Sequence, residues 1–293
     1  MKYKAIFFIL ALSLFGCSNQ NDKSDAYGNF EAETVIVSSE ASGKILQLNV
    51  EKGQKIDAGS VTALIDTVQV YLKLQQIEAQ KTAVEAKRKS VNAQVAVFEE
   101  QKKNLQTNEI RVKQMLADGA ATQKQLDDIT GQISVINRQI ESTKTQFTAI
   151  TTELQVLETQ MESTLDLLNR CKVISPANGT ILETYIEQGE LAAPGKPLFK
   201  MANLGELTLK VYVSGAQLPG IKIGQEVKVL VDKNDTENQS FTGKITWISS
   251  EAEFTPKIIQ TKEERVKLVY AVKVAVKNDG TLKIGMPGEV SWQ

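Results

Sequence analysis

Residues 112–126 read VKQMLADGAATQKQL, and two heptad series of apolar residues run outward from this stretch in opposite directions. The first series is Val70, Ile77, Val84, Val91, Phe98, Leu105 and Val112, and the second is Leu126, Ile133, Ile140, Phe147, Leu154, Met161 and Leu168. When the series are paired antiparallel, the two residue numbers of every pair add up to 238, so the chain folds back at residue 119. That residue is Gly119, which can adopt the positive φ that ends a helix. The pattern predicts an antiparallel coiled-coil hairpin with its turn at Gly119.

The composition of residues 67–170 supports two long helices. The first 175 residues contain no proline, and this segment has only two glycines, Gly119 and Gly131. At 1.5 Å per residue each arm is about 70 Å long. A compact bundle would need further breaks that the sequence does not contain. The first helix has the thinner apolar seam, and because charged residues follow four of its seam positions, we expect a polar outer face; these residues are Lys81, Arg88, Lys102 and Glu109.

Two short segments that flank the predicted hairpin repeat each other at an offset of 136 positions. The first runs from Gly43 through Gly53 to Gly59, and the second from Gly179 through Gly189 to Gly195. Alternating apolar residues lie between the glycines, which is typical of short strands joined by turns. Neither half has enough apolar surface for its own core, so we expect the halves to pack together. The insertion between them must therefore leave and return at one place.

After Leu204 the pattern changes to strands separated by Gly, Asn, Asp and Pro. The expected strands are 207–213, 226–231, 241–248, 266–276 and 286–292, with a helical turn near 217–221. About five strands of this length predict a small β-barrel in residues 205–293.

Composition excludes several classes of function. The 293 residues are 42% hydrophobic and 24% charged, which is ordinary for a folded protein. A net charge of -1 gives no electrostatic reason to expect nucleic acid. The chain has no histidine and only two cysteines, so the usual hydrolase bases and zinc sites are missing. We expect no enzyme activity, no cofactor and no metal site, and we interpret Cys171 as a buried structural thiol.

The N-terminus has the features of an export signal. Lys2 and Lys4 precede an apolar run at 5–15 that is too short to cross a bilayer. The run ends at Leu14-Phe15-Gly16-Cys17, which resembles a bacterial lipobox and implies that Cys17 is lipidated. An ordinary signal peptide with an incidental cysteine is the alternative. We assign 1–17 to the lipoprotein signal and 18–30 to a flexible polar tether, which places the protein in the periplasm with a lipid anchor.

The order of these segments resembles the HlyD-type membrane fusion proteins, the periplasmic adaptors of bacterial export systems. The halves at 31–66 and 171–204 look like the two parts of a biotinyl/lipoyl domain, residues 67–170 like the family's α-hairpin, and residues 205–293 like its β-barrel. The resemblance implies an elongated α+β multidomain fold. It also implies an inner-membrane transporter and an outer-membrane channel as partners, and a homo-oligomeric ring that is commonly a hexamer.

The hairpin turn carries a second resemblance. Adaptors that dock on TolC-like channels have an Arg, a Leu four residues later and a Ser seven residues after that. Here the corresponding residues are Arg111, Met115 and Thr122, two conservative departures, and Asp127 matches an acidic position that often follows. The resemblance implies that this tip docks on the channel.

Two features of the C-terminal part bear on the class of transporter. Residues 254–272 resemble the barrel segment of adaptors of ABC-type exporters, and the longer C-terminal tail common in RND-pump adaptors is not seen. We therefore favour an ABC-type partner in the inner membrane of a Gram-negative bacterium, with an RND-type drug or metal efflux pump as the alternative. A lipoyl or biotin carrier is a further alternative, but Lys44, Lys52 and Lys55 do not lie at the turn that joins the halves, where a carrier has its modified lysine. The exported small molecule or peptide and the leaflet that holds the anchor stay open.

Overall fold

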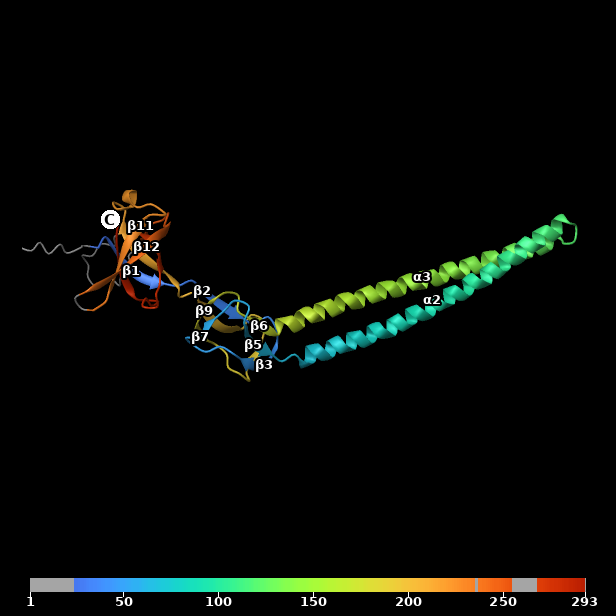
Figure 1. Cartoon of the computed structure of the whole chain (residues 1–293), viewed down its shortest axis with the longest axis horizontal. Helices are drawn as coiled ribbons and strands as arrows, with labels where there is room; N and C mark the ends of the chain where they lie inside the picture. The colour runs from blue at the N-terminus through green and yellow to red at the C-terminus, as the bar shows by residue number, and fades with distance from the viewer. Residues whose placement is uncertain (1–23, 235–236, 255–267, 293) are drawn as a thin grey trace, which may run out of the picture.

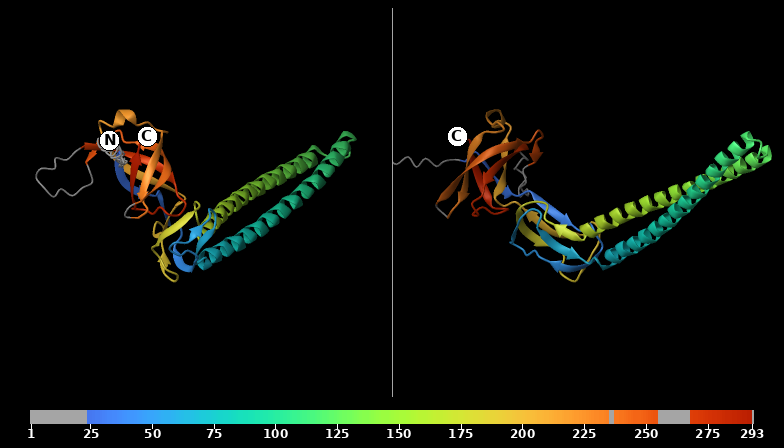
Figure 2. Two further views of the ribbon diagram at one scale, coloured as in Figure 1. Left: turned by 60° about the vertical axis from the view of Figure 1, so that its left-hand side comes forward. Right: turned by 45° about the vertical axis from the view of Figure 1, so that its right-hand side comes forward.

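The computed structural model describes residues 24–234, 237–254 and 268–292, which form three domains in a row (Figure 1). A β-barrel lies at one end, a sandwich of short strands lies in the middle, and a helical hairpin projects from the sandwich. Figure 2 shows the same order from two further directions, with the sandwich always between barrel and hairpin. The predicted elongated α+β architecture is confirmed.

The sandwich is built from both halves of the split repeat. The first half supplies β2 (Thr34–Ser38), β3 (Gly43–Leu48), β4 (Lys55–Ile56) and β5 (Val61–Ile65), and the second supplies β6 (Lys172–Ile174), β7 (Gly179–Thr184), β8 (Leu191–Ala192) and β9 (Pro197–Ala202). One sheet has the order β2-β9-β7-β4 and the other β6-β5-β3-β8. Each sheet takes two strands from each half, so the halves share one core, as the repeat predicted.

The offset of 136 positions recurs in three dimensions. Gly53 and Gly189 both have a positive φ, 88° and 95°, at equivalent turns. Ile65 and Met201, another equivalent pair, are both buried in the sandwich core. A glycine is required at the two turns because other residues rarely adopt this φ. The shared backbone geometry explains why the glycine spacing is identical in the two halves.

The hairpin consists of α2 (Val68–Ala117) and α3 (Gln123–Arg170). Every residue of the two heptad series is buried or half-buried, so both series face the partner helix. Three ion pairs cross between the helices: Lys81 with Glu158 at 3.0 Å, Lys87 with Glu153 at 4.0 Å and Lys144 with Glu99 at 3.3 Å. Antiparallel coiled coils place such pairs on the flanks of the seam. The predicted hairpin is confirmed.

The expectation that four charged residues lie on the outer face of the first helix is wrong. They are half-buried and lie on the seam: Lys81, Arg88, Lys102 and Glu109. Lys81 reaches across to Glu158, with 3.0 Å between Nζ and Oε1. A long side chain can cover apolar surface with its methylenes while its charge stays in water, which reconciles these residues with a seam position. The centre of the opposite face of α2 instead carries Ala79, Ala86 and Ala93, all exposed.

The barrel combines the C-terminal strands with one strand from the N-terminal segment. Its strands are β1 (Ala26–Glu31), β10 (Glu206–Ser214), β11 (Glu226–Asp232), β12 (Asn238–Ile248), β14 (Leu268–Lys277) and β15 (Pro287–Ser291), with the short β13 (Glu253–Phe254) beside β14 and the 3-10 turn η1 (Leu218–Gly220) after β10. The order β10-β1-β15-β11-β12-β14 closes because β14 also pairs with β10. The predicted barrel is confirmed, with six strands in the closed ring.

Strand β1 corrects the boundary of the expected tether at 18–30. Residues 26–30 pair with β10 on one side and β15 on the other, and Phe30 is fully buried in the barrel core. Residues 18–23 lie outside the described part of the chain. Because only Ala26 and Phe30 of this strand are buried, its apolar alternation is too short to be recognised in a polar segment.

We predict that Phe30→Ala lowers the free energy of unfolding of the barrel by about 3–5 kcal/mol, because it leaves a large cavity where β1 contacts the core. Both tryptophans of the chain, Trp247 and Trp292, belong to this domain, so denaturant unfolding followed by tryptophan fluorescence reports on it selectively. Asn29→Ala, on the exposed side of the same strand, should change this free energy by no more than about 0.5 kcal/mol. Equal losses in the two variants would contradict the role of β1.

Candidate functional site

The turn between the helices is a Schellman motif that places Gly119 just beyond the end of α2. The Ala120 N–H donates to the Met115 carbonyl at 2.7 Å, and the Gly119 N–H donates to the Leu116 carbonyl at 3.1 Å. These two bonds satisfy carbonyls that the helix end leaves free. Gly119 has a φ of 73°, which this motif requires and which glycine adopts without strain. The local sequence thus reverses the chain within a few residues.

Thr122 caps the N-terminus of α3 together with Gln125. The Thr122 hydroxyl accepts from the Gln125 N–H at 3.4 Å, and the Gln125 side-chain oxygen accepts from the Thr122 N–H at 2.8 Å. This reciprocal capping box satisfies two N–H groups at the helix start. Thr122 therefore has a structural role at the tip, whatever it contacts outside the chain.

Arg111 and Met115 lie one helical turn apart near the end of α2. Both are exposed, Met115 with 41% of its surface accessible. The Arg111 guanidinium makes one long contact, 3.5 Å from Nη1 to the side-chain oxygen of Asn108. Residues four apart share a helix face, so a cation and an apolar thioether project together from the end of the hairpin. On α3, Asp127 accepts from the Gln123 amide at 2.8 Å.

A groove of about 850 Å³ lies between the helices just behind the tip. It is lined by Gln101, Asn104, Leu105, Asn108, Asp127, Asp128, Gly131, Gln132, Val135 and Ile136. Its floor is apolar, and its rim presents amides and two carboxylates. Gly131 is one of the lining residues. The groove was not predicted from the sequence, although a glycine inside a long helix was a signal that could have marked it.

The structure thus brings part of the sequence-predicted site together. Arg111, Met115 and the groove residue Asn108 occupy one stretch of α2, and Gly119 positions the turn beside them. Thr122 begins α3 and uses its hydroxyl in the cap. The arrangement offers a guanidinium for carbonyls or carboxylates and an apolar contact for a groove between helices.

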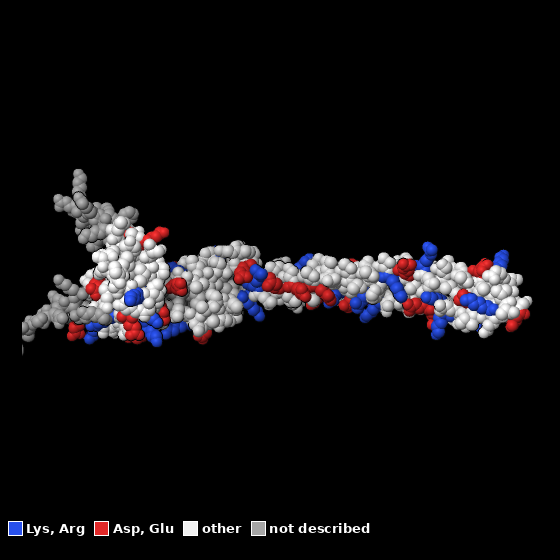
Figure 3. Space-filling view, turned by 90° about the horizontal axis from the view of Figure 1, so that it is seen from above, with Lys and Arg blue, Asp and Glu red and all other residues white. Residues whose placement is uncertain are grey.

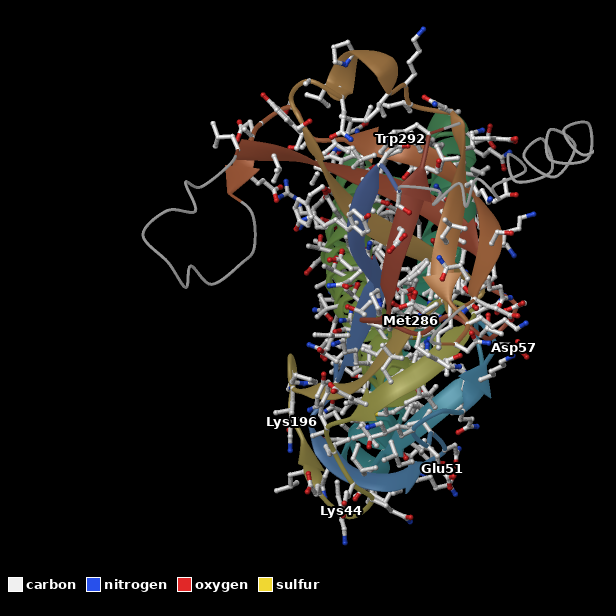
Figure 4. All side chains as sticks on the ribbon, turned by 90° about the vertical axis from the view of Figure 1, so that its left-hand side faces the viewer. Lys44, Glu51, Asp57, Lys196, Met286 and Trp292 are labelled. Atoms are coloured by element: carbon white, nitrogen blue, oxygen red, sulfur yellow. The ribbon has the colours of Figure 1, made fainter. Side chains whose placement is uncertain are left out.

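The first described residues, Ser24 and Asp25, lie at the end of the barrel that is farthest from the sandwich. The Asp25 carboxylate accepts from the Trp292 N–H at 2.9 Å, and the Asp25 carbonyl accepts from the Gln217 amide at 2.8 Å. Figure 4 shows Trp292 at this far end and Met286 at the end that faces the sandwich. Cys17, the predicted lipidation site, lies outside the described residues, seven positions before Ser24.

Cys171 ends α3 where the chain returns to the sandwich. Its side chain is fully buried and contacts the Leu167 carbonyl, with 3.3 Å from sulfur to oxygen. Burial, with a smaller contribution from the Asp66 carboxylate, raises the pKa of the Cys171 thiol. A thiol that resists ionisation in a core is a poor nucleophile. Cys171 belongs to the packing of the sandwich.

Within residues 24–234, 237–254 and 268–292, no group of three or more Cys, Asp or Glu side chains is placed to hold a metal ion. None of the helices there has an apolar stretch long enough to cross a membrane.

Comparison with known proteins covers nearly the whole described chain. A family model described as "RND MFP, barrel-sandwich hybrid domain" matches residues 33–202, which is more than half of the sequence. A second, described as "LcnD-like, C-terminal domain", matches residues 204–292. The two matches meet between the sandwich and the barrel.

The chain is also similar to a curated relative and to a solved structure. The UPF0194 membrane protein YbhG of Salmonella gallinarum is 30% identical over 305 residues, which cover 94% of this chain and 90% of the relative. The crystal structure of MacA from Actinobacillus actinomycetemcomitans is 22% identical, with a TM-score of 0.56, and the match covers 90% of this chain and 76% of that one. The latter likeness concerns the fold.

We predict that Thr122→Ala frays the start of α3, because losing an N-cap costs about 1 kcal/mol and should speed amide exchange of residues 123–126 about fivefold. Hydrogen exchange followed by mass spectrometry measures this. Thr122→Ser keeps a hydroxyl at the cap and should exchange like the native chain. If the serine variant frays as much as the alanine variant, the capping role of Thr122 is wrong.

Proposed function

The chain belongs to the membrane fusion proteins, which are non-enzymatic periplasmic adaptors, and from this premise we propose that it links an ABC-type inner-membrane transporter to a TolC-like outer-membrane channel. Adaptors of this type bridge inner-membrane transporters and outer-membrane channels. The expectation that the chain is not an enzyme is confirmed by its family. The cargo that we propose is a small molecule or peptide.

The observation that carries the proposal is the exposed tip of the hairpin. Helix α2 has 50 residues, which corresponds to about 75 Å between the sandwich and the tip. Near this far end of α2, Arg111 and Met115 are exposed, and the described chain gives them little to contact. A guanidinium can bind a carboxylate or several carbonyls, and a thioether adapts to shallow apolar grooves. These are the surfaces that the ends of a helical channel offer.

The ABC-type partner rests on the resemblance of residues 254–272, of which the structure describes 254 and 268–272. One observation favours the RND-type alternative, namely the family model of the sandwich, whose description names RND adaptors. The energy source of export distinguishes an ABC-type partner from an RND-type partner. Export that survives collapse of the proton gradient but stops on ATP depletion supports the ABC-type partner, and the opposite result supports an RND pump.

Anchoring and assembly complete the proposal. A lipid on Cys17 would hold the barrel near a membrane, because Asp25 is bonded to the far end of the barrel. We assign the anchor to the inner membrane, so that the hairpin points across the periplasm. A single two-helix rod cannot enclose a path, whereas a closed head-to-tail ring can. We therefore propose a homo-oligomeric ring, a hexamer by analogy with the family.

Arg111→Asp should reduce export about thirtyfold or more, which is the loss expected when a central arginine of an interface is removed. The substitution reverses an exposed charge without touching the seam, so the chain should fold and reach the periplasm normally. The measurement is efflux or secretion of the cargo in cells that carry the variant as their only copy.

The matched control is Lys89→Asp, an equal charge reversal at an exposed position of α2, about 33 Å from Arg111 along the helix. It should export normally. Normal export by Arg111→Asp at a normal protein level would remove the tip from the mechanism.

Cys17→Ala should move the protein from the membrane fraction to the soluble periplasm, because acyl chains contribute roughly 0.8 kcal/mol per buried methylene to membrane binding. Cell fractionation measures the shift, and intact mass of the native chain should show the lipid. Ser18→Ala, the neighbouring change, should stay with the membrane. Native protein without a lipid, or a membrane-bound Cys17→Ala variant, contradicts the anchor.

A further inference from the structure

The outer faces of the two helices carry complementary rows of residues that the hairpin itself does not use. We define the α2 row and the α3 row as the residues opposite the seam over the middle of each helix. The α2 row is Ala79, Ala86, Ala93, Glu100 and Thr107, and the α3 row is Thr159, Thr152, Thr145, Arg138 and Gly131. All ten residues are exposed. Both rows recur every seven residues, so each is straight along the coiled coil.

The two rows match when they are compared at equal height along the hairpin. The first member of the α2 row pairs with the first member of the α3 row, and so on to the fifth. The residue numbers of every pair add up to 238, as they do for the seam. Three alanines then face three threonines, Thr107 faces Gly131, and Glu100 faces Arg138. The pattern ends towards the base, where Leu72 would face Asp166.

Cyclic symmetry explains why equal height is the relevant comparison. In a ring whose axis runs along the hairpin, rotation from one copy to the next changes no height. Helix α2 of one copy then lies beside α3 of the next at the register found inside each hairpin. That register is set by the seam and by the ion pairs Lys87 with Glu153 and Lys144 with Glu99.

The rows suit close packing of helices. Alanine and glycine let helix axes approach to the lower end of the usual 8–10 Å range. The hydroxyls of Thr145, Thr152 and Thr159 donate to carbonyls of their own helix at 3.1, 3.2 and 3.1 Å. These hydroxyls therefore already have a partner when water is removed.

Charge and apolar exposure point to the same partner. Arg138 forms no ion pair with any described residue, and Glu100 contacts only the exposed Lys103, at 3.8 Å. Val97, Val135 and Val156, which flank the rows on one side, are 51%, 57% and 52% exposed. The nearest residues on the same flank of a neighbour, one position away from equal height, would be Ser142, Asn104 and Ala83. Figure 3 shows both basic and acidic residues on the visible face of the hairpin.

From this match we infer that the α2 row of one copy packs against the α3 row of a second copy of this chain at equal height, with Glu100 paired to Arg138 of the neighbour. The inference rests on the proposed ring and specifies which surfaces build it. It makes the lateral contact head-to-tail, because one copy contributes α2 and the next contributes α3.

Disulfide cross-linking of the full chain in cells tests the register. Ala86→Cys combined with Thr152→Cys should give, on oxidation, a ladder of linked copies on a denaturing gel. A bond within one hairpin is impossible, because the two rows lie on opposite sides of the helix pair, with their Cα atoms about 13–15 Å apart, whereas a disulfide needs Cα atoms within about 7 Å. Ala79→Cys with Thr159→Cys is an independent pair with the same expectation.

The matched control is Ala86→Cys with Gly131→Cys, in which the second cysteine is displaced by 21 residues, about 32 Å along α3. It should give no ladder. A ladder from the control pair, or none from either equal-height pair, overturns the inference.

Charge exchange tests the ion pair in the same assay. Glu100→Arg and Arg138→Glu should each lower the yield of the 86–152 cross-link about three- to tenfold, and the double variant should restore it. A double variant that links no better than the single variants overturns the pairing of Glu100 with Arg138. Export measured in parallel separates this inference from the proposed function. Normal export without the equal-height ladder overturns the packing alone, whereas a normal ladder with export insensitive to Arg111→Asp leaves the packing and overturns the docking tip.

Discussion

The rest of the structure depends on the hydrogen bonding between β5 and β6, the two strands at which the hairpin leaves and re-enters the sandwich. Leu64 pairs with Lys172, and the Ile65 N–H donates to the Cys171 carbonyl at 2.9 Å. The ends of a segment of more than 100 residues are therefore held at the spacing of neighbouring strands, about 4.8 Å. Two helices that begin and end there start as neighbours, and the seam then keeps them side by side. The Arg170 to Glu40 ion pair at 3.2 Å adds a side-chain contact at the same base.

In the barrel, too, strand pairing joins segments that are far apart in the sequence. Strand β1 lies between β10 and β15, although Tyr27 and its partner Tyr212 are far apart in sequence. The segment that leads to the predicted anchor is thus a structural element of the barrel. This segment is held to the barrel by the strand hydrogen bonds of β1 and by the buried Phe30 side chain. The Asp25 contacts with Trp292 and Gln217 hold it as well. Closure through β1 also removes two sheet edges that would otherwise be free to pair with other chains.

The placement of charge on α2 connects the stability of one chain with its proposed assembly. Lys81, Arg88, Lys102 and Glu109 occupy seam positions, where each buries less apolar surface than a leucine would. The centre of the outer face of α2 carries the small residues Ala79, Ala86 and Ala93 instead. A partly polar seam and a small-residue outer face fit the proposed packing of one hairpin against a neighbouring copy.

The sequence by itself determined the hairpin, its turn at Gly119 and the split repeat. These features depend on periodicities that many positions share, and such periodicities are visible in the order of the residues alone. Fourteen apolar residues agree on one fold-back point, and three glycine pairs agree on one offset. Only the tertiary structure decided the place of β1, the direction of the charged residues of α2, and the groove behind the tip. A six-residue strand has too few alternating positions to be recognised, and its partners are strands about 180 and 260 residues away. A lysine or arginine can lie on a seam or in solvent, and the packing of the facing helix, which the local sequence does not contain, decides between the two.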